Sequence, residues 1–201
     1  MKTKTIELIF DFVSPNAYLV WRPLCALAAR QDAQIKITPA FLGGMHRLTR
    51  NAPPFIRDAE VKGKNAYASL EMQRFIARHG LHRFKMNPKF PFNSANLLRM
   101  LVSLHSDDQI DFVEALMSPI WEEGLDVTDA AAVAAVLTVA GFDAQSLAAK
   151  AQEPAIKQAL FDATENAVGR GAFGIPTFFI GTEMFFGKER LGQIEEMLAG
   201  G

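Results

Sequence analysis

Apolar and polar residues alternate near the start of the chain and then give way to a helical pattern. Over residues 5–12 the apolar side chains occupy every second position: Ile6, Leu8, Phe10 and Phe12. This alternation predicts a strand, and Ile9 on the other face indicates that both faces are at least partly buried. Ser14 and Pro15 then form a strong helix start, with serine as N-cap and proline in the first helical position. A helix is therefore predicted over residues 16–30.

A second strand is predicted over residues 35–42, where the paired glycines Gly43 and Gly44 end the apolar run. Together with the segments before it, this strand makes a strand–helix–strand unit. Such units are almost always right-handed, with parallel strands.

Helical patterns fill the middle of the chain, and two strands return near its end. Helices are predicted over 59–79, 93–105, 109–121, 128–140, 145–152 and 154–168. Strands at 176–180 and 184–186 flank a Gly-Thr-Glu turn, and a helix over 188–198 follows. The order predicts an α/β fold: a thioredoxin-like domain, residues 1–43 and 154–201, with an inserted all-helical domain, residues 44–153.

Composition narrows the class of protein. The 201 residues carry 21 Lys and Arg against 22 Asp and Glu, and 49% are hydrophobic, which is typical of a globular protein with a substantial core. Because the positive and negative charges nearly cancel, the chain is not expected to bind nucleic acid. Glu7 and Asp11 interrupt the apolar core that a signal peptide needs, and no apolar run is long enough for a membrane span. The single cysteine, Cys25, excludes an internal disulfide or a CxxC pair and favours the reducing cytoplasm.

Three apparent motifs are better explained structurally. Gly169-x-Gly171-x-x-Gly174 has dinucleotide-binding spacing, but a helix precedes it and a strand follows, the reverse of what that motif needs. His79 and His82 lack the accompanying ligands of a zinc site, so no metal is expected. Cys25 lies among apolar helix residues and is interpreted as a small core side chain.

Ser14 is the residue most suggestive of chemistry. It can simply cap its helix. Its position also places a hydroxyl donor at a helix N-terminus, which stabilises anions and lowers the pKa of a thiol located there. Pro176, at the start of a strand, would lie beside that helix end in a thioredoxin-like domain. If Ile175-Pro176 were cis, the Ile175 backbone could pair with an extended peptide; the sequence leaves cis and trans open.

Four segments give the chain a family resemblance: FDFVSPNAYL (10–19), FLGGMHRLTRNAPP (41–54), MNPKFPFNSANLLR (86–99) and RGAFGIPTFFIGTEMFFGKERL (170–191). In this order they resemble the 2-hydroxychromene-2-carboxylate isomerases and the kappa-class glutathione transferases. Both belong to the disulfide-oxidoreductase-like thioredoxin folds that carry a helical insertion.

The resemblance implies glutathione as cofactor and Ser14 as the catalytic residue. Ser14 and Ala17 stand where redox relatives carry the two cysteines of CxxC, so the thiolate must come from the cofactor. Glutathione contacts carry over by position to Asn51, Lys64, Ile175, Pro176, Gly187, Lys188 and Glu189. The resemblance implies that Lys64 reaches the glycyl carboxylate, with Lys62 as the competing lysine. Three positions depart from the usual family residues: Arg50 replaces a glycine, Lys188 a small polar residue and Glu189 an aspartate.

The resemblance further implies an isomerase. A thiolate held by Ser14 and the helix N-terminus adds to a 2-hydroxychromene-2-carboxylate-like ring acid, and the product is trans-o-hydroxybenzylidenepyruvate. Arg47, Arg50 and Lys64 are the candidate cations for the substrate carboxylate. Met45, Phe92 and Trp121 are candidate apolar walls between the two domains. A homodimer is expected on the same ground.

Two other functions stay open at this level. A kappa-like glutathione transferase or peroxidase would use the same thiolate on aryl halides or hydroperoxides. A non-catalytic thioredoxin-like module could hold a peptide at Pro176, although such a module would not need Ser14, Asn51 and Lys64 together.

Overall fold

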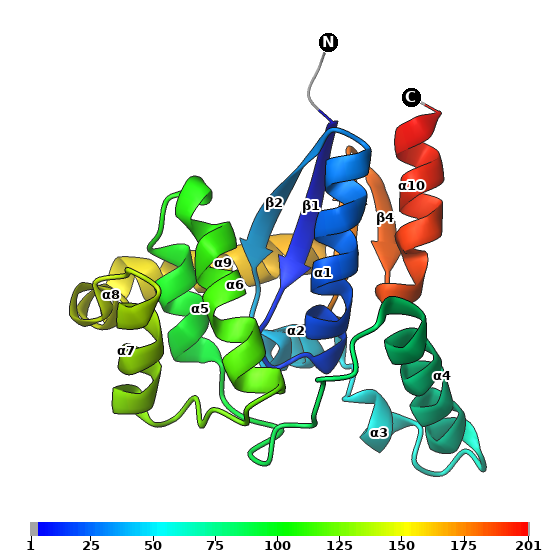
Figure 1. Cartoon of the computed structure of the whole chain (residues 1–201), viewed down its shortest axis with the longest axis horizontal. Helices are drawn as coiled ribbons and strands as arrows, with labels where there is room; N and C mark the ends of the chain where they lie inside the picture. The colour runs from blue at the N-terminus through cyan, green and yellow to red at the C-terminus, as the bar shows by residue number, and fades with distance from the viewer. Residues whose placement is uncertain (1–3, 201) are drawn as a thin grey trace.

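The computed structural model describes residues 4–200, and their four strands form one mixed sheet in the order β2-β1-β3-β4 (Figure 1). β1 (Lys4–Phe10) and β2 (Ala33–Pro39) are parallel. β3 (Thr177–Ile180) and β4 (Glu183–Phe186) form a hairpin whose first strand runs antiparallel to β1. The predicted strand–helix–strand unit and the predicted C-terminal hairpin are therefore confirmed.

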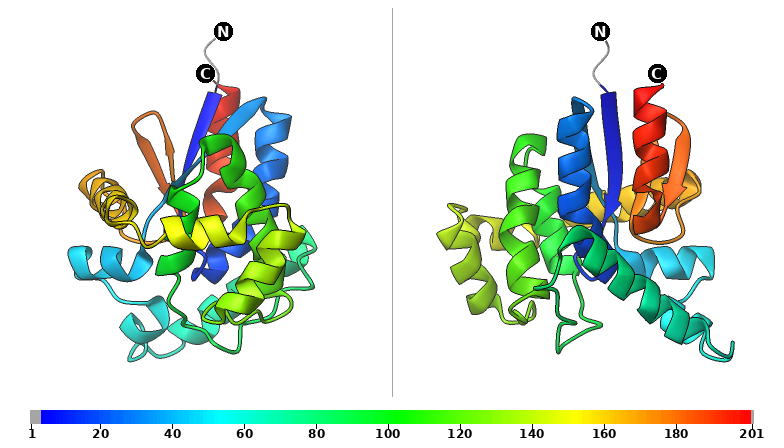
Figure 2. Two further views of the ribbon diagram at one scale, coloured as in Figure 1. Left: turned by 90° about the vertical axis from the view of Figure 1, so that its left-hand side faces the viewer. Right: turned by 45° about the vertical axis from the view of Figure 1, so that its right-hand side comes forward.

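Helix α1 (Pro15–Arg30) follows β1, and Ser14 is its N-cap, as predicted. Figure 1 shows α1 and the C-terminal helix on the near face of the sheet, whereas α9 crosses behind it; the side view in Figure 2 agrees. Both faces of β1 are thus covered, which explains why Ile6, Leu8 and Ile9 are all fully buried.

Between β2 and β3 the described chain forms only helices. Their bounds are α2 (Leu42–Thr49), α3 (Pro54–Arg57), α4 (Lys64–His79), α5 (Ala95–Val102), α6 (Ser106–Trp121), α7 (Ala130–Val139), α8 (Ala144–Lys150) and α9 (Pro154–Gly169). Figure 1 shows α5 to α8 grouped on the β2 side of the sheet, while α3 and α4 extend from the opposite side, below the C-terminal helix. The exact borders of the predicted domains stay a prediction.

Two predicted boundaries differ clearly from the structure. The second strand ends at Pro39, not Leu42, because Leu42 begins α2; Gly43 and Gly44 lie within this helix. A Cβ on either glycine would come within 3.2–3.3 Å of the Phe41 ring, so close packing accounts for the pair. The helix predicted from residue 59 begins only at Lys64, after Gly63 with φ of +84°.

The last predicted helix is divided in two. A short 3₁₀ turn, η1 (Lys188–Arg190), precedes α10 (Leu191–Ala199). Within residues 4–200, no helix is long and apolar enough to cross a membrane.

Candidate active site

Ser14 lies at the junction of β1 and α1, where the sheet meets the helix N-terminus. Its Oγ accepts a hydrogen bond from the Ala17 N–H at 3.3 Å, which is the N-cap interaction. The same hydroxyl donates to the carbonyl oxygen of Ile175 at 3.0 Å, across 161 residues of sequence. Ser14 is 3% exposed. The structure thus brings the predicted catalytic serine and the predicted Ile175-Pro176 segment into direct contact.

The Ile175-Pro176 peptide bond is cis. The segment is held on its other side by β4, since the N–H of Gly187 donates to the Pro176 carbonyl oxygen at 3.0 Å. Gly174 allows this close packing, because a Cβ there would lie 2.7 Å from the Phe186 ring. Gly187 therefore lies beside Pro176, as a shared site would require.

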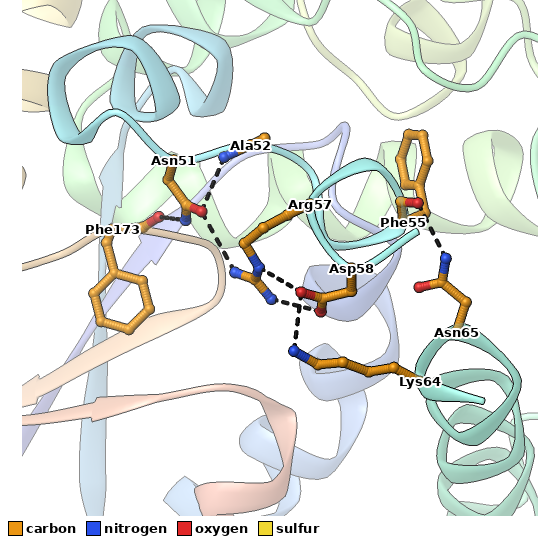
Figure 3. A network of polar contacts seen from close by, with 8 residues as sticks. All are labelled: Asn51, Ala52, Phe55, Arg57, Asp58, Lys64, Asn65 and Phe173. Atoms are coloured by element: carbon orange, nitrogen blue, oxygen red, sulfur yellow. Dashed lines mark hydrogen bonds and ion pairs between the residues drawn. The ribbon is translucent and has the colours of Figure 1, made fainter. Parts of the chain in front are cut away.

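Asn51 connects the segment after α2 to the same loop. Its Nδ2 donates to the carbonyl oxygen of Phe173 at 2.9 Å, two residues before Ile175 (Figure 3). Its Oδ1 accepts from the N–H of Ala52 at 2.9 Å. The predicted site residue Asn51 is thus adjacent to the loop that carries Ile175.

Lys64, the first residue of α4, belongs to a charged cluster with Arg57 and Asp58 (Figure 3). The Lys64 Nζ lies 2.9 Å from Asp58 Oδ1, and the Arg57 guanidinium binds both carboxylate oxygens of Asp58 at 2.8 Å. Arg57 Nη1 also reaches Asn51 Oδ1 at 3.4 Å. Hydrogen bonds from Arg57 and then Lys64 hold the pKa of Asp58 well below its ordinary value. Asn51 and Lys64 are therefore joined through Arg57 and Asp58, two residues that sequence reasoning missed.

Lys188 and Glu189 lie beside the C-terminal half of α4. Lys188 is 5% exposed, pairs with the Glu189 carboxylate and lies 5.3 Å from the centre of the Phe75 ring. Both residues line a hollow of about 430 Å³ between α1, α4 and α10. Ser14, Asn51, Lys64 and Pro176 do not line it. In the segment 187–189, Gly187 is the residue that hydrogen-bonds to the Ser14–Pro176 part of the site, through its N–H to the Pro176 carbonyl oxygen.

The three candidates for substrate binding differ in exposure. Arg47 and Arg50 are exposed on α2 and at its C-cap, where Arg50 adopts φ of +55°. Trp121 is fully buried, and its Nε1 donates to the Phe12 carbonyl oxygen at 3.1 Å. In this structure Trp121 binds the backbone two residues before Ser14 and presents no exposed surface to a substrate.

An aromatic cluster surrounds Trp121 and reaches the solvent through other rings. Phe84, Phe90 and Phe92 all lie about 6 Å from the Trp121 ring. Phe90 in turn makes an edge contact with Phe55, which is 45% exposed. Met45 and Phe92, the other predicted walls, are buried. Phe55 is thus the exposed ring of this cluster, and Phe84 and Phe90 are partly exposed.

Asp11 was overlooked as a site residue, although it is the only charge in the apolar segment next to Ser14. It is fully buried, and its carboxylate accepts hydrogen bonds from the N–H of Val13 at 3.1 Å and of Leu42 at 2.8 Å. Its own carbonyl oxygen accepts from the Ser14 N–H at 3.2 Å. Burial raises the pKa of Asp11 to about 6. A charge inside the apolar run IFDFV was the signal that could have identified it.

No cysteine of the described chain lies at the α1 N-terminus. Cys25 is further along the helix, and burial raises the pKa of its thiol to about 11, so it stays protonated at neutral pH. Residues 4–200 also contain no group of three or more His, Cys, Asp or Glu side chains arranged to hold a metal ion. A nucleophile at Ser14 must therefore be the hydroxyl itself or a group brought by a ligand.

Comparisons with known proteins agree over almost the whole chain. The family model of the DsbA-like thioredoxin domain matches residues 5–199. The chain is 31% identical to a 2-hydroxychromene-2-carboxylate isomerase of Sphingobium xenophagum over 199 residues, 98% of each protein. It is 26% identical to human glutathione S-transferase kappa 1 over 207 residues, 97% of this chain and 91% of the relative.

A solved structure gives the same result. That of a 2-hydroxychromene-2-carboxylate isomerase superposes with a TM-score of 0.83 at 25% identity, covering 98% of this chain and 95% of the other. The predicted thioredoxin-like fold class and the predicted family resemblance are confirmed.

Proposed function

Because the chain belongs to the DsbA-like thioredoxin family, within the group of 2-hydroxychromene-2-carboxylate isomerases and kappa-class glutathione transferases, we propose that it is a glutathione-dependent isomerase. Its substrates would be 2-hydroxychromene-2-carboxylate-like ring acids and its product trans-o-hydroxybenzylidenepyruvate. The observation that carries the proposal is the 3.0 Å hydrogen bond from Ser14 Oγ to the Ile175 carbonyl oxygen, beside a cis-proline. It combines a hydroxyl donor, a helix N-terminus and an extended backbone in one place.

The chemistry of the surrounding residues fits glutathione, a peptide with two carboxylates, one ammonium and one thiol. The backbone at Ile175 is suited to pair with a peptide. Arg57 and Lys64 supply cations for a carboxylate, and Asn51 an amide. When bound, glutathione would supply the thiolate nucleophile that the chain lacks near Ser14.

Ser14 would act as a hydrogen-bond donor. Its hydroxyl has a single proton, which it donates to the Ile175 carbonyl oxygen in the structure. Rotation about the Cβ–Oγ bond redirects that proton toward an anion at the helix end. The free N–H groups and partial positive charge of the α1 N-terminus favour the same anion. Both effects lower the pKa of a thiol, which raises the thiolate fraction at neutral pH.

Exposed rings and cations near this end of the molecule suit an aromatic acid. Phe55 presents apolar surface next to Phe90, and Arg47 and Arg50 are exposed cations on the neighbouring α2 segment. We assign the substrate carboxylate to this basic segment and the ring to the Phe55–Phe90 surface. We also propose a homodimer in the cytoplasm, on the basis of the family and the single, partly buried cysteine.

Calorimetric titration with reduced glutathione tests the proposal. Wild-type protein is expected to bind saturably, and Ser14→Ala to bind about tenfold more weakly or worse, because a hydrogen bond to a charged group is removed. Asp129→Ala is the matched control, since Asp129 caps α7 in the helical insertion with the same kind of side-chain bond. Equal weakening in both variants, or no binding by the wild type at millimolar glutathione, would contradict the proposal.

A kappa-like glutathione transferase is the second candidate, favoured by the match to the human kappa-class enzyme. The two activities share Ser14 and differ in the electrophile. Absorbance assays with a chromene acid and with an aryl halide, each with and without glutathione, separate them. Glutathione-dependent turnover of the aryl halide alone would replace the isomerase with the transferase.

A further inference from the structure

Two cations and one carboxylate meet at the Asn51 end of the site, and their exposures differ. The side chains of Arg57 and Lys64 are 46% and 51% exposed, whereas that of Asp58 is 10% exposed. Arginine carries five N–H donors and lysine three. Asp58 uses two donors of Arg57 and one of Lys64, so donors of both cations remain free on the solvent side.

The cluster is physically connected to the Ser14 end of the site. Arg57 Nη1 approaches Asn51 Oδ1 at 3.4 Å, and Asn51 Nδ2 donates to the Phe173 carbonyl oxygen. Phe173 leads directly into Ile175 and Pro176. Figure 3 shows the resulting chain of contacts, from Phe173 through Asn51 and Arg57 to Asp58 and Lys64.

The family resemblance implies that Lys64 reaches the glycyl carboxylate of glutathione. We propose that Arg57 is the second cation at that carboxylate, and that Asp58, which binds both cations, is an internal competitor that weakens glutathione binding. This inference rests on the proposed function. The three groups have a net charge of +1, and without the Asp58 carboxylate they have +2. An incoming carboxylate therefore shares or takes over donors that Asp58 now occupies.

Asp58 stays ionised over the whole working range, because its two cations lower its pKa. Competition is therefore constant across neutral pH and does not act as a pH switch. The alternative role for Asp58 is to hold Lys64 in position for the ligand. The two roles predict opposite results when the charge of Asp58 is removed, which makes them separable.

The experiment compares glutathione with its glycine ethyl ester, which lacks the glycyl carboxylate, by calorimetric titration of wild type and Asp58→Asn. Competition predicts that Asp58→Asn binds glutathione about two- to fivefold more tightly, as expected for partly exposed ion pairs. Affinity for the ester should stay within error. Asp126→Asn is the matched control: it makes the same change at an aspartate paired with Lys89 in the helical insertion, and should alter neither affinity.

Weaker glutathione binding by Asp58→Asn, or an equal change for the ester, would overturn the inference. Arg57→Gln decides the matter if Asp58→Asn does not fold: it should weaken glutathione binding and spare the ester, and an unchanged affinity would remove Arg57 from the pair. Failure of the proposed function is a different result, namely no binding of glutathione by the wild type.

Discussion

Two aspartates, Asp11 and Asp58, show that the site is built from two unlike regions. Asp11 is buried beneath Ser14, bonded to backbone N–H groups of Val13 and Leu42, and burial raises its pKa to about 6. Asp58 lies on the α3–α4 segment, where Arg57 and Lys64 lower its pKa. The Asp11 carboxylate accepts backbone hydrogen bonds and has no cationic partner. The Asp58 carboxylate is paired with two partly exposed cations. Burial and partners thus shift the pKa of the same kind of side chain in opposite directions.

Two helices of equal length repeat this contrast. α1 and α4 each have 16 residues, but α1 buries eight of them and α4 only Phe75. Ser14 therefore caps a helix with eight buried residues, whereas Lys64 begins a helix with one. We expect the Ser14 end to be rigid and the cationic end to adjust to the ligand.

The largest expected effect is a difference in the free energy of unfolding between a leucine substitution in α1 and one in α4. Leu24→Ala in α1 should lower the free energy of unfolding by about 2–5 kcal/mol, because Leu24 is fully buried and leaves a cavity. Leu70→Ala in α4 should cost only about 0.5 kcal/mol, since Leu70 is 41% exposed. Urea unfolding measures both. Similar losses for the two variants would contradict the contrast, and would mean that α4 is covered by a partner in solution.

The next prediction concerns Asp11 and pH. Its folded pKa of about 6 lies above the ordinary value of 3.8, so the folded protein holds this proton more tightly than the unfolded chain. The stabilisation is present below the ordinary value and is lost as pH rises through about 6, amounting to about 3 kcal/mol at most. The stability of wild type relative to Asp11→Asn should therefore fall between pH 4 and about 6.

Urea titrations at several pH values measure this difference. Asp126→Asn provides the control, because Thr128 and Lys89 lower the pKa of Asp126 and the sign is reversed: its contribution is lost as pH falls. A wild-type advantage over Asp11→Asn that stays flat from pH 4 to 7 would show that Asp11 ionises freely in the fold.

The smallest expected effect is local. Asn51→Ala removes the hydrogen bond to Phe173 and should raise amide hydrogen exchange in residues 51–79, with a cost of about 1 kcal/mol in that segment. Exchange in α1 should stay unchanged. Asn65→Ala, which removes a bond within the segment itself, to Phe55, is the control. If Asn51→Ala raised exchange in α1 as strongly as in α4, the two regions would be one cooperative unit.

Residues with local signals were predictable, and residues defined by distant contacts were not. Ser14, Pro15 and the start of α1 follow from capping rules that act within four residues. The start of α2 was missed, because it depends on Asp11 bonding Leu42 and on Thr164 bonding Phe41, both remote in sequence. Gly43 and Gly44 predicted the end of an element, whereas in the structure they lie within α2 and pack closely against Phe41.

The charged cluster of Arg57, Asp58 and Lys64 could not be predicted for a related reason. Arg57 and Asp58 are adjacent oppositely charged residues in a polar stretch, a pattern common on any surface, and nothing in the sequence shows that they join Asn51 to Lys64. Lys64 and Asn51 were predicted through family resemblance alone. The Ile175-Pro176 cis bond likewise could be suspected from the fold and not read from the residues.

The sheet order has a consequence for how the protein is made. β1 is synthesised before both of its neighbours, β2 and β3, and β3 is synthesised only after helices α2 to α9. Until then the apolar strand β1 has one open hydrogen-bonding edge, a surface on which nascent chains aggregate. Ser14 also has no Ile175 to bond before that moment. The pairing of β1 with β3 and the contact of Ser14 with Ile175 therefore both need residues 175–180, and a fragment that ends before them has neither.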